Sequence, residues 1–209
     1  YASFGYVKQE GIYAKGHADY ERYNVRLNYN NVLLDTKSRN WLNKISFGAI
    51  ASYSKSIQTG NTIGNSEAAG LITSMNMLPP TEPVYQTDPA ILEQYAVTYP
   101  NHVIAPNGLA YNIIEMREIT NPLAAMQVSH NQRTMPQNFG ANFNLDVDLL
   151  PGLKFKTTYG AEWVFNSIKN VTPVYELNAT SKNATSKVED KKRESSYWQW
   201  ENVLSYTKS

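Results

Sequence analysis

Hydrophobic and polar residues alternate over long stretches of this chain, most clearly on the two sides of Pro151-Gly152. In 137–149, the odd-numbered residues from 139 onward are aromatic or aliphatic, and the residues between them are asparagine, aspartate or glycine. In 153–165 the odd-numbered residues are again largely apolar, and their neighbours include lysine, threonine, glycine and glutamate. A period of two predicts two β-strands, each with one apolar and one polar face.

The same period recurs along the chain and predicts six strands in all. They lie at 1–9, 20–34, 41–56, 137–149, 153–165 and 195–208. Two long connections, 58–135 and 167–194, lack the alternation and are predicted to be loops. The second connection ends in the charged run 189–194, which we interpret as a solvated loop surface.

Two short helices are predicted inside the first long loop. One spans 66–76, with Ser66 as its N-cap residue. The other spans 89–97, with Asp88 as its N-cap and Pro89 at the first helical position. We expect the loop to be ordered by side-chain packing rather than by regular strand pairing, with aliphatic and tyrosine side chains turned inward.

The lengths of the connections favour one class of β protein. From the second strand onward they are short, very long, short and long, so the long loops gather at one end of the strands. Outer-membrane barrels combine long strands, short periplasmic turns and long extracellular loops. The predicted fold class is therefore all-β: antiparallel strands of a partial transmembrane outer-membrane β-barrel, with short helices in its extracellular loops. The turns at 35–40 and 150–152 would be periplasmic.

Aromatic residues lie where a barrel needs them. They are found toward the long-loop ends at Tyr23, Tyr53, Phe139 and Trp163, and at a short-turn end at Trp41. This distribution matches the two aromatic girdles of a membrane barrel. The apolar faces would then contact outer-membrane lipid, and the polar faces would line a lumen. The alternative is a soluble β-sandwich, in which apolar faces are buried against each other.

Composition adds a few constraints. The chain has 209 residues and a net charge of +1, so no strong attraction to nucleic acid is expected. It contains no cysteine, which excludes disulfides and thiolate chemistry. Tyrosine is the commonest aromatic residue, with 15 copies, which suits a boundary between apolar and polar surroundings. Because the chain begins and ends in strand-like sequence without an initiating methionine, we interpret it as an internal piece of a larger protein.

Several phrases resemble one family in their order and spacing. They are YASFGYVKQEGI, DYERYNVRLNYN, WLNKISFGAIASYS, MLPPTEPVY, NPLA at 121–124, LLPGLKFKTTYGAEW and YWQWENVLSYTK. Together they resemble the barrel of SusC/RagA-like TonB-dependent outer-membrane transporters, and the resemblance covers essentially the whole chain.

The resemblance implies a barrel of about 22 strands, closed by an N-terminal plug domain and energised through the TonB complex. It implies a SusD-like surface lipoprotein over the barrel mouth and the import of oligosaccharides or peptides. This chain would supply barrel wall and extracellular loops in the bacterial outer membrane, with no cofactor and no catalysed reaction. The alternatives are a passive porin-like barrel and a secreted carbohydrate-binding β-sandwich.

Candidate contact residues follow from the predicted faces and loops. Six polar-face side chains could contact a hydroxyl-rich substrate; the alternatives are that they line a hydrated lumen or pack against a plug. They are Arg22, Asn24, Arg26, Asn28, Asn142 and Asn144. Four loop tyrosines are candidates for lid contact, for packing within the loop, or for stacking on sugar rings: Tyr85, Tyr95, Tyr99 and Tyr111.

No catalytic or metal-binding pattern stands out. His17, His102 and His130 have no companion at the spacing of metal ligands, and we interpret them as loop histidines. Three Asn-X-Thr sequences begin at Asn170, Asn178 and Asn183. We interpret them as marks of a polar, exposed loop.

The hairpin on the two sides of Pro151-Gly152 allows a register to be predicted. Opposed residues share a face, so their numbers must add to an even value, whereas a plain two-residue turn would pair Leu150 with Leu153. We therefore expect an odd-length connection with a bulge at Gly152, which tolerates a left-handed conformation. This register opposes Asp148 to Lys154, Asp146 to Lys156, Val147 to Phe155, Phe143 to Tyr159 and Phe139 to Trp163. The two charge pairs would face the lumen near its periplasmic end.

Overall fold

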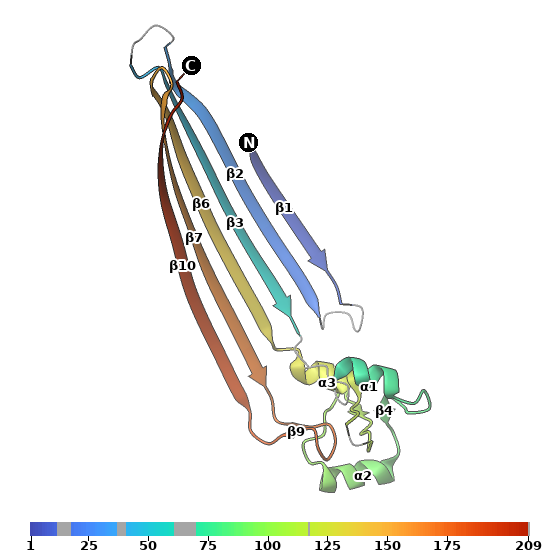
Figure 1. Ribbon diagram of the computed structural model, residues 1–209. Coiled ribbons are helices and arrows are strands. Elements are labelled where there is room, and N and C mark those ends of the chain that lie inside the picture. The colour runs from blue at the N-terminus through green and yellow to red at the C-terminus, as the bar shows by residue number, and fades with distance from the viewer. Residues whose placement is uncertain (12–17, 37–40, 61–69, 117, 209) are drawn as a thin grey trace.

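A sheet of six antiparallel strands, arranged in space in the order of the chain, dominates the computed structural model (Figure 1). The structure describes residues 1–11, 18–36, 41–60, 70–116 and 118–208. The strands are β1 (Ala2–Gln9), β2 (Asp19–Asp35), β3 (Lys44–Thr59), β6 (Arg133–Leu150), β7 (Leu153–Thr172) and β10 (Lys187–Tyr206). The fold is therefore mostly antiparallel β-structure, as the alternation predicts. Among the described residues, β1 and β10 are the edges of this sheet.

The strands extend further toward the long loops than predicted. The prediction that 167–194 is entirely loop is wrong, because 167–172 of β7 pairs with 187–192 of β10. The charged run 189–194 is likewise strand rather than loop. Beyond the apolar face the backbone ladder continues while both faces carry mostly polar side chains. The alternation of hydrophobicity that reveals a strand in sequence is therefore missing there.

The sheet has one apolar and one polar face, and the strand pairing shows which residues share each. On the apolar face one row runs through Val25, Tyr53, Phe139 and Trp163, which are paired strand to strand. Three of the four aromatic residues predicted near the long-loop ends therefore share one row, and Tyr23, on the same face, pairs with Lys55 in the next row toward the long loops. Residues of the apolar face remain widely exposed to solvent: Phe4 69%, Leu27 50%, Tyr29 53%, Phe143 44%, Trp198 66%, Trp200 65% and Leu204 64%. The described residues provide no second layer that buries this face.

The β6–β7 hairpin has the predicted register away from its turn. All five predicted pairs are present: Asp148 with Lys154, Asp146 with Lys156, Val147 with Phe155, Phe143 with Tyr159 and Phe139 with Trp163. Each of these pairs has an even sum, so apolar residues oppose apolar residues and aspartates oppose lysines.

The turn itself differs from the prediction. Leu150 pairs with Leu153 across a two-residue Pro151-Gly152 turn, so the expected odd-length connection is wrong. Gly152 has a φ of 82°, in the left-handed region that was expected for it. The register shifts between Asp148 and Leu150, which leaves Leu149 as the extra residue. A bulge at Leu149, one step before the turn, therefore restores the shared faces.

The two long connections fold together into a compact unit at one end of the sheet (Figure 1). This unit, the cap, comprises the described residues of 70–132 and 173–186. It contains α1 (Leu71–Met77), α2 (Pro89–Thr98) and α3 (Pro122–Ser129), and the two-residue strands β4 (Tyr85–Gln86), β5 (Ala110–Tyr111), β8 (Tyr175–Glu176) and β9 (Lys182–Asn183). None of the helices in the described part of the chain is long and apolar enough to span a membrane.

The cap has its own core, and both long connections contribute to it. Its buried residues are Val103, Ala105, Tyr111, Ala124, Ala125 and Leu177. Leu71, Tyr85, Leu123, Val128 and Tyr175 pack against them. Packing of aliphatic and tyrosine side chains thus orders the long loop, as predicted. Strand pairing in the described part of the cap consists of two two-residue ladders and two isolated bridges.

The helices of the cap begin at residues with clear capping signals in two of three cases. The Asp88 side chain accepts a hydrogen bond from the Ala90 backbone N–H at 2.9 Å, as predicted for α2. Asn121 caps α3 in the same way, followed by a proline, although α3 is not among the predicted helices. The first helix begins at Leu71, later than predicted, with Gly70 as its N-cap. Ser66, the predicted cap, lies outside the described residues.

Candidate functional site

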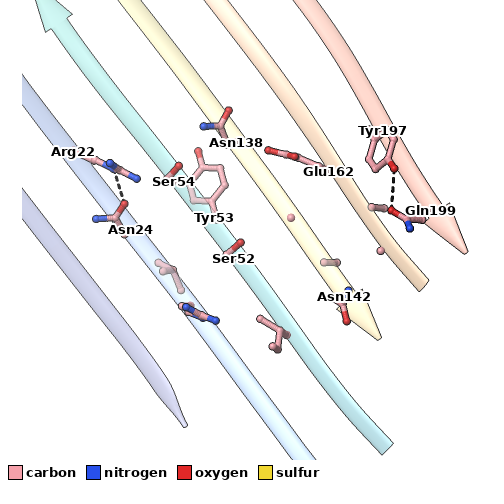
Figure 2. Close-up of a pocket in the computed structure, with 17 residues that line it drawn as sticks. Arg22, Asn24, Ser52, Tyr53, Ser54, Asn138, Asn142, Glu162, Tyr197 and Gln199 are labelled. Carbon is pink, nitrogen blue, oxygen red and sulfur yellow. Dashed lines mark hydrogen bonds between the residues drawn. The ribbon is translucent and has the colours of Figure 1, made fainter. Parts of the chain in front are cut away.

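A broad hollow with a volume of about 710 Å³, the trough, lies on the polar face of the sheet (Figure 2). Its floor is made of small residues on the central strands: Ser52, Ser54, Gly140 and Gly160. Longer side chains of β2, β7 and β10 border it: Arg22, Asn24, Arg26, Glu162, Tyr197 and Gln199. The trough is therefore a shallow depression that reaches from β2 to β10 and is bordered by polar side chains.

Strand pairing explains the shape of the trough. One row of the sheet runs from Arg26 through Ser52, Gly140 and Glu162 to Tyr197. With about 4.8 Å between neighbouring strands, the Cα atoms of Arg26 and Glu162 lie about 14 Å apart. Ser52 and Gly140 are too small to fill this gap. A guanidinium and a carboxylate therefore face each other across an open floor, which suits a ligand rich in hydroxyl or amide groups.

Hydrogen bonds around the trough run along the strands rather than across it. Arg22 donates from Nε to Asn24 Oδ1 at 2.8 Å, and further along β2, outside the trough, Asn30 donates to Asn28 Oδ1 at 2.9 Å. On β10, Tyr197 donates to Gln199 Oε1 at 2.9 Å (Figure 2). These bonds join residues two apart on one strand, which point to the same face. They orient the bordering side chains and leave the floor of the trough uncovered.

Four of the six predicted polar-face residues line the trough: Arg22, Asn24, Arg26 and Asn142. Asn28 and Asn144 lie on the same face but outside the trough, nearer the short turns. Three of the residues that border the trough were not predicted, Glu162, Tyr197 and Gln199. The signal for the last two was available, because Tyr197 and Gln199 alternate with two tryptophans on the apolar face.

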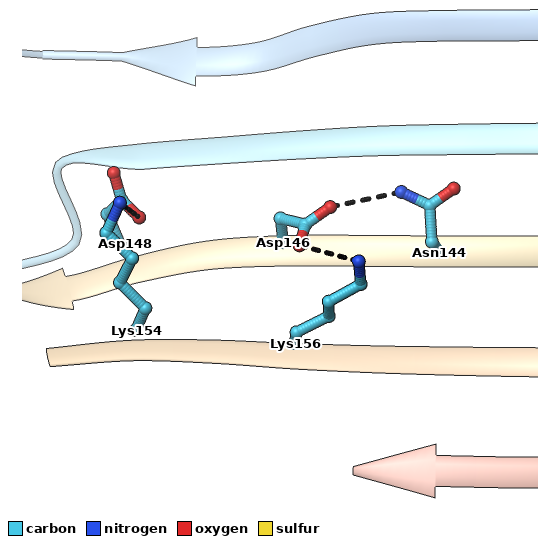
Figure 3. A network of polar contacts seen from close by, with 5 residues as sticks. All are labelled: Asn144, Asp146, Asp148, Lys154 and Lys156. Carbon is cyan, nitrogen blue, oxygen red and sulfur yellow. Dashed lines mark hydrogen bonds and ion pairs between the residues drawn. The ribbon is translucent and has the colours of Figure 1, made fainter. Parts of the chain in front are cut away.

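The four predicted charged residues form two ion pairs on the polar face (Figure 3). Lys154 Nζ lies 3.8 Å from Asp148 Oδ1, and Lys156 Nζ lies 4.0 Å from Asp146 Oδ1. Asn144 also donates to Asp146 Oδ2 at 3.0 Å. The lysine side chains are more than half exposed, so water screens both pairs. Their geometry fixes the hairpin register more than it adds stability.

We therefore expect Asp146→Asn to reduce the free energy of unfolding by less than about 1 kcal/mol, because exposed ion pairs contribute about 0.2–1 kcal/mol. Asparagine retains an acceptor for Asn144. Urea titration of the wild type and the variant checks this. A loss several times larger would mean that the pair lies in a dry environment.

The four candidate tyrosines of the long loop are largely used within the cap. Tyr95 and Tyr111 are only 6% and 7% exposed, so lid contact by these two is excluded in this arrangement. Burial, with a smaller contribution from Tyr85, raises the pKa of Tyr111. Tyr85 stacks on Tyr111 with ring centroids 5.4 Å apart, and Tyr99 meets Tyr95 edge-on at 6.1 Å. These two half-buried rings keep part of their surface at the outside of the cap.

Buried asparagines that the sequence did not single out join segments of the cap through hydrogen bonds. Asn112 donates to Glu82 Oε2 at 3.0 Å and accepts a hydrogen bond from the Tyr95 hydroxyl at 3.3 Å. Asn121 donates to the Val84 carbonyl at 2.8 Å while capping α3. Both amides are almost fully buried. Asn112 joins side chains of the cap, and Asn121 satisfies backbone groups that packing alone would leave unpaired.

The interpretation of the Asn-X-Thr sequences as exposed loop is wrong for Asn178. This side chain is 3% exposed and donates to the Ile119 carbonyl at 3.0 Å, which joins the two long connections. Asn170 lies within β7 and donates to Glu189 at 3.2 Å. Asn183 donates to the carbonyls of Pro173 and Thr185. All three asparagines therefore have structural partners.

The histidines form no metal site in the described part of the chain, where no cluster of three or more potential ligands is found. His102 and His130 do border the same hollow of about 680 Å³ in the cap. The His102 Nδ1 atom lies 2.9 Å from the Tyr99 carbonyl oxygen, which favours a proton on that nitrogen. His17 lies outside the described residues.

No protein-family model matches the chain, and no curated protein matches it. The function must therefore be argued from the two-faced sheet, the trough and the cap.

Proposed function

We propose that this chain is part of the wall of a transmembrane β-barrel in a bacterial outer membrane, with its cap outside the cell. The observation that carries the proposal is the exposed apolar face of the sheet, which bears tryptophans and leucines opposite a polar face with arginines, asparagines and charge pairs. Large exposed apolar surfaces mark contact with a partner or with lipid. Lipid outside and water inside is the arrangement that satisfies both faces.

The height of the apolar face fits a bilayer. On β7 the apolar face runs from Leu153 to Phe165. At about 3.4 Å per residue this is about 40 Å along the strand. The tilt of barrel strands, about 40°, reduces it to about 30 Å across the membrane. The hydrocarbon core of a bilayer is about 30 Å thick.

Two polar side chains on the apolar face donate hydrogen bonds within the sheet. The Trp200 indole N–H donates to Thr157 Oγ1 at 2.9 Å, and Asn31 donates to the Tyr29 hydroxyl at 2.9 Å. An unsatisfied polar group in hydrocarbon costs several kcal/mol. These internal hydrogen bonds support placing this face in lipid.

The edges of the sheet support the same conclusion. Strand β10 is 20 residues long, and within the described residues it is paired on one side only, with β7. Unpaired backbone groups are not tolerated in hydrocarbon, so further strands would have to continue the sheet at both edges. A sandwich would instead need a layer over the apolar face, whereas the cap lies at the end of the strands (Figure 1).

We further propose that the barrel is a TonB-dependent importer of oligosaccharides or peptides that works with a SusD-like surface lipoprotein. The resemblance of seven sequence phrases to SusC/RagA-like transporters supports this, as does a polar trough with an arginine side and a carboxylate side. The alternative is a passive porin-like barrel. In cells whose uptake of a labelled oligosaccharide or peptide depends on this protein, a protonophore should stop uptake. Uptake that persists would favour the porin.

Topology is tested with single cysteines in the protein as the cell makes it, since this chain has none of its own. We expect Ala184→Cys in the cap to react with an impermeant maleimide in intact cells. Pro151→Cys, in the short turn, should react only after the outer membrane is permeabilised. Labelling of the turn but not of the cap would reverse the topology, and labelling of both in intact cells would contradict membrane insertion.

The lid partner is tested with a photocrosslinking amino acid on α2. Val97 is 83% exposed at the outer side of this helix, whereas Tyr95 is buried. A crosslinker at position 97 should capture a surface lipoprotein, and one at position 95 should react within the cap. If cells that lack the lipoprotein gave the same crosslinked products at position 97 as cells that contain it, α2 would not be part of the lid contact.

A further inference from the structure

Two cations oppose each other directly where β6 and β7 continue beyond the apolar face. Arg133 pairs with Lys169, and the constant register places both on the same side of the sheet as Phe139 and Trp163. Both are exposed. Like charges directly opposite in an antiparallel pair repel each other and destabilise the pairing. An anion between them would remove this repulsion.

The described residues do not supply that anion. Neither Arg133 nor Lys169 has an ion pair or side-chain hydrogen bond within the described part of the chain. Asp190 of β10 is paired with Lys169 along the backbone, yet the two side chains form no ion pair. Lys192 and Glu194 lie on the same side of β10, nearer the apolar face, and form none either.

The opposite side of the same strands is different. There Glu189 lies 2.9 Å from Lys191 Nζ and 3.8 Å from Lys187 Nζ. The hydrogen bond from Lys191, and then that from Asn170, lower the pKa of Glu189. On the polar side one carboxylate, Glu189, therefore pairs with two lysines, whereas Arg133 and Lys169 on the side of the apolar face have no ion-pair partner among the described residues.

The height of the cation pair matches a lipid headgroup. Lys169 is four residues beyond Phe165, about 14 Å along the strand and about 10 Å above the apolar boundary at a tilt of about 40°. Headgroup layers add about 5–8 Å on each side of the hydrocarbon. Arginine and lysine side chains are long enough to reach back to that level.

We propose that Arg133 and Lys169 bind the phosphate of an anionic lipid headgroup on the cap side of the membrane. The proposal rests on the proposed membrane function. The planar guanidinium of Arg133 can hold two phosphate oxygens, and the Lys169 ammonium adds a point charge. Because Asp190 borders Lys169 on its other side, the anion sits between β6 and β7.

The test uses the full protein in nanodiscs of phosphatidylcholine containing phosphatidylglycerol as the probe. Native mass spectrometry counts the phosphatidylglycerol molecules retained on release from the disc. The double variant Arg133→Gln/Lys169→Gln should retain about tenfold less than the wild type, since each cation near a membrane surface contributes measurably to anionic lipid binding. The control Lys187→Gln/Lys191→Gln removes the same charge from the other side and should retain the wild-type amount.

Equal retention by the wild type and the double variant would overturn the proposal, as would an equal loss in the control. Inorganic phosphate at the same concentration as phosphatidylglycerol should not displace the bound lipid. Displacement would indicate a site for free anions instead of a lipid headgroup. Labelling of Ala184→Cys in the same variants separates failure of the headgroup site from failure of the proposed membrane function. If the protein is inserted and labelled but retention does not change, only the headgroup site fails. If the protein is not inserted, the proposed function fails.

Discussion

A lysine in place of Phe143 should prevent most of the protein from assembling in the outer membrane. Phe143 pairs with Ala49 and Tyr159 in the middle row of the apolar face. A lysine at the midplane of a barrel wall costs roughly 2–4 kcal/mol. Such a loss is a large part of the stability of a typical protein. The amount of folded protein in isolated outer membranes, and its urea denaturation in vesicles, measure the effect.

The matched control is Asn142→Lys, one residue away on the same strand. Asn142 borders the trough on the polar face, where an added ammonium remains in water. This variant should assemble like the wild type. If the two lysine variants assembled equally well, the apolar face would not be in lipid. If only Asn142→Lys failed, the two faces would be reversed.

Replacing Leu177 by alanine should detach the second long connection from the cap. Leu177 is 6% exposed and is the residue of that connection in the buried cluster. Loss of a buried leucine side chain costs about 2–5 kcal/mol. Two flanking hydrogen bonds depend on that packing, one from the Glu176 backbone N–H to the Asn101 carbonyl and one from the Asn178 side-chain amide to the Ile119 carbonyl. Trypsin added to intact cells should then cleave after Lys182, and hydrogen exchange should accelerate over 175–183.

Val174→Ala is the control for this prediction. Val174 belongs to the same connection but is 39% exposed, so its truncation should change proteolysis little. Rapid cleavage of both variants, or of neither, would contradict the view that the cap is one packed unit built from two loops. The barrel wall should be unaffected by either change, because β7 and β10 remain paired over their full lengths.

The sequence predicts the strands well wherever one face is apolar. There the alternation identifies both the strand and its faces, and the charges of Asp146 and Lys156 identify the register. It fails beyond the apolar face, at 167–172 and 187–194, because a strand with two polar faces has the composition of a loop. The position of the bulge cannot be predicted from the sequence either. One extra residue at Leu149 or at Gly152 gives opposed residues with even sums equally well.

The candidate site is only half predictable for a related reason. Arg22 and Asn24 can be assigned to the polar face from one strand alone. The trough requires knowledge of which strands are neighbours, because its floor is defined by Gly140 and Ser52 between longer side chains. In the cap, Asn121-Pro122 is a capping residue followed by proline, like Asp88-Pro89, so α3 could have been predicted from the sequence. The burial of Asn178 could not, because it depends on contact between two loops that are far apart in sequence.

The central claim is that the sheet separates lipid from water, and site-directed spin labelling along 139–147 of β6 tests it most directly. Single labels in the protein in outer-membrane vesicles are exposed to oxygen, which concentrates in lipid, and to a nickel chelate, which stays in water. We predict that odd positions favour oxygen and even positions favour the chelate, alternating at every residue. Equal access of the chelate to both sets of positions would contradict the account.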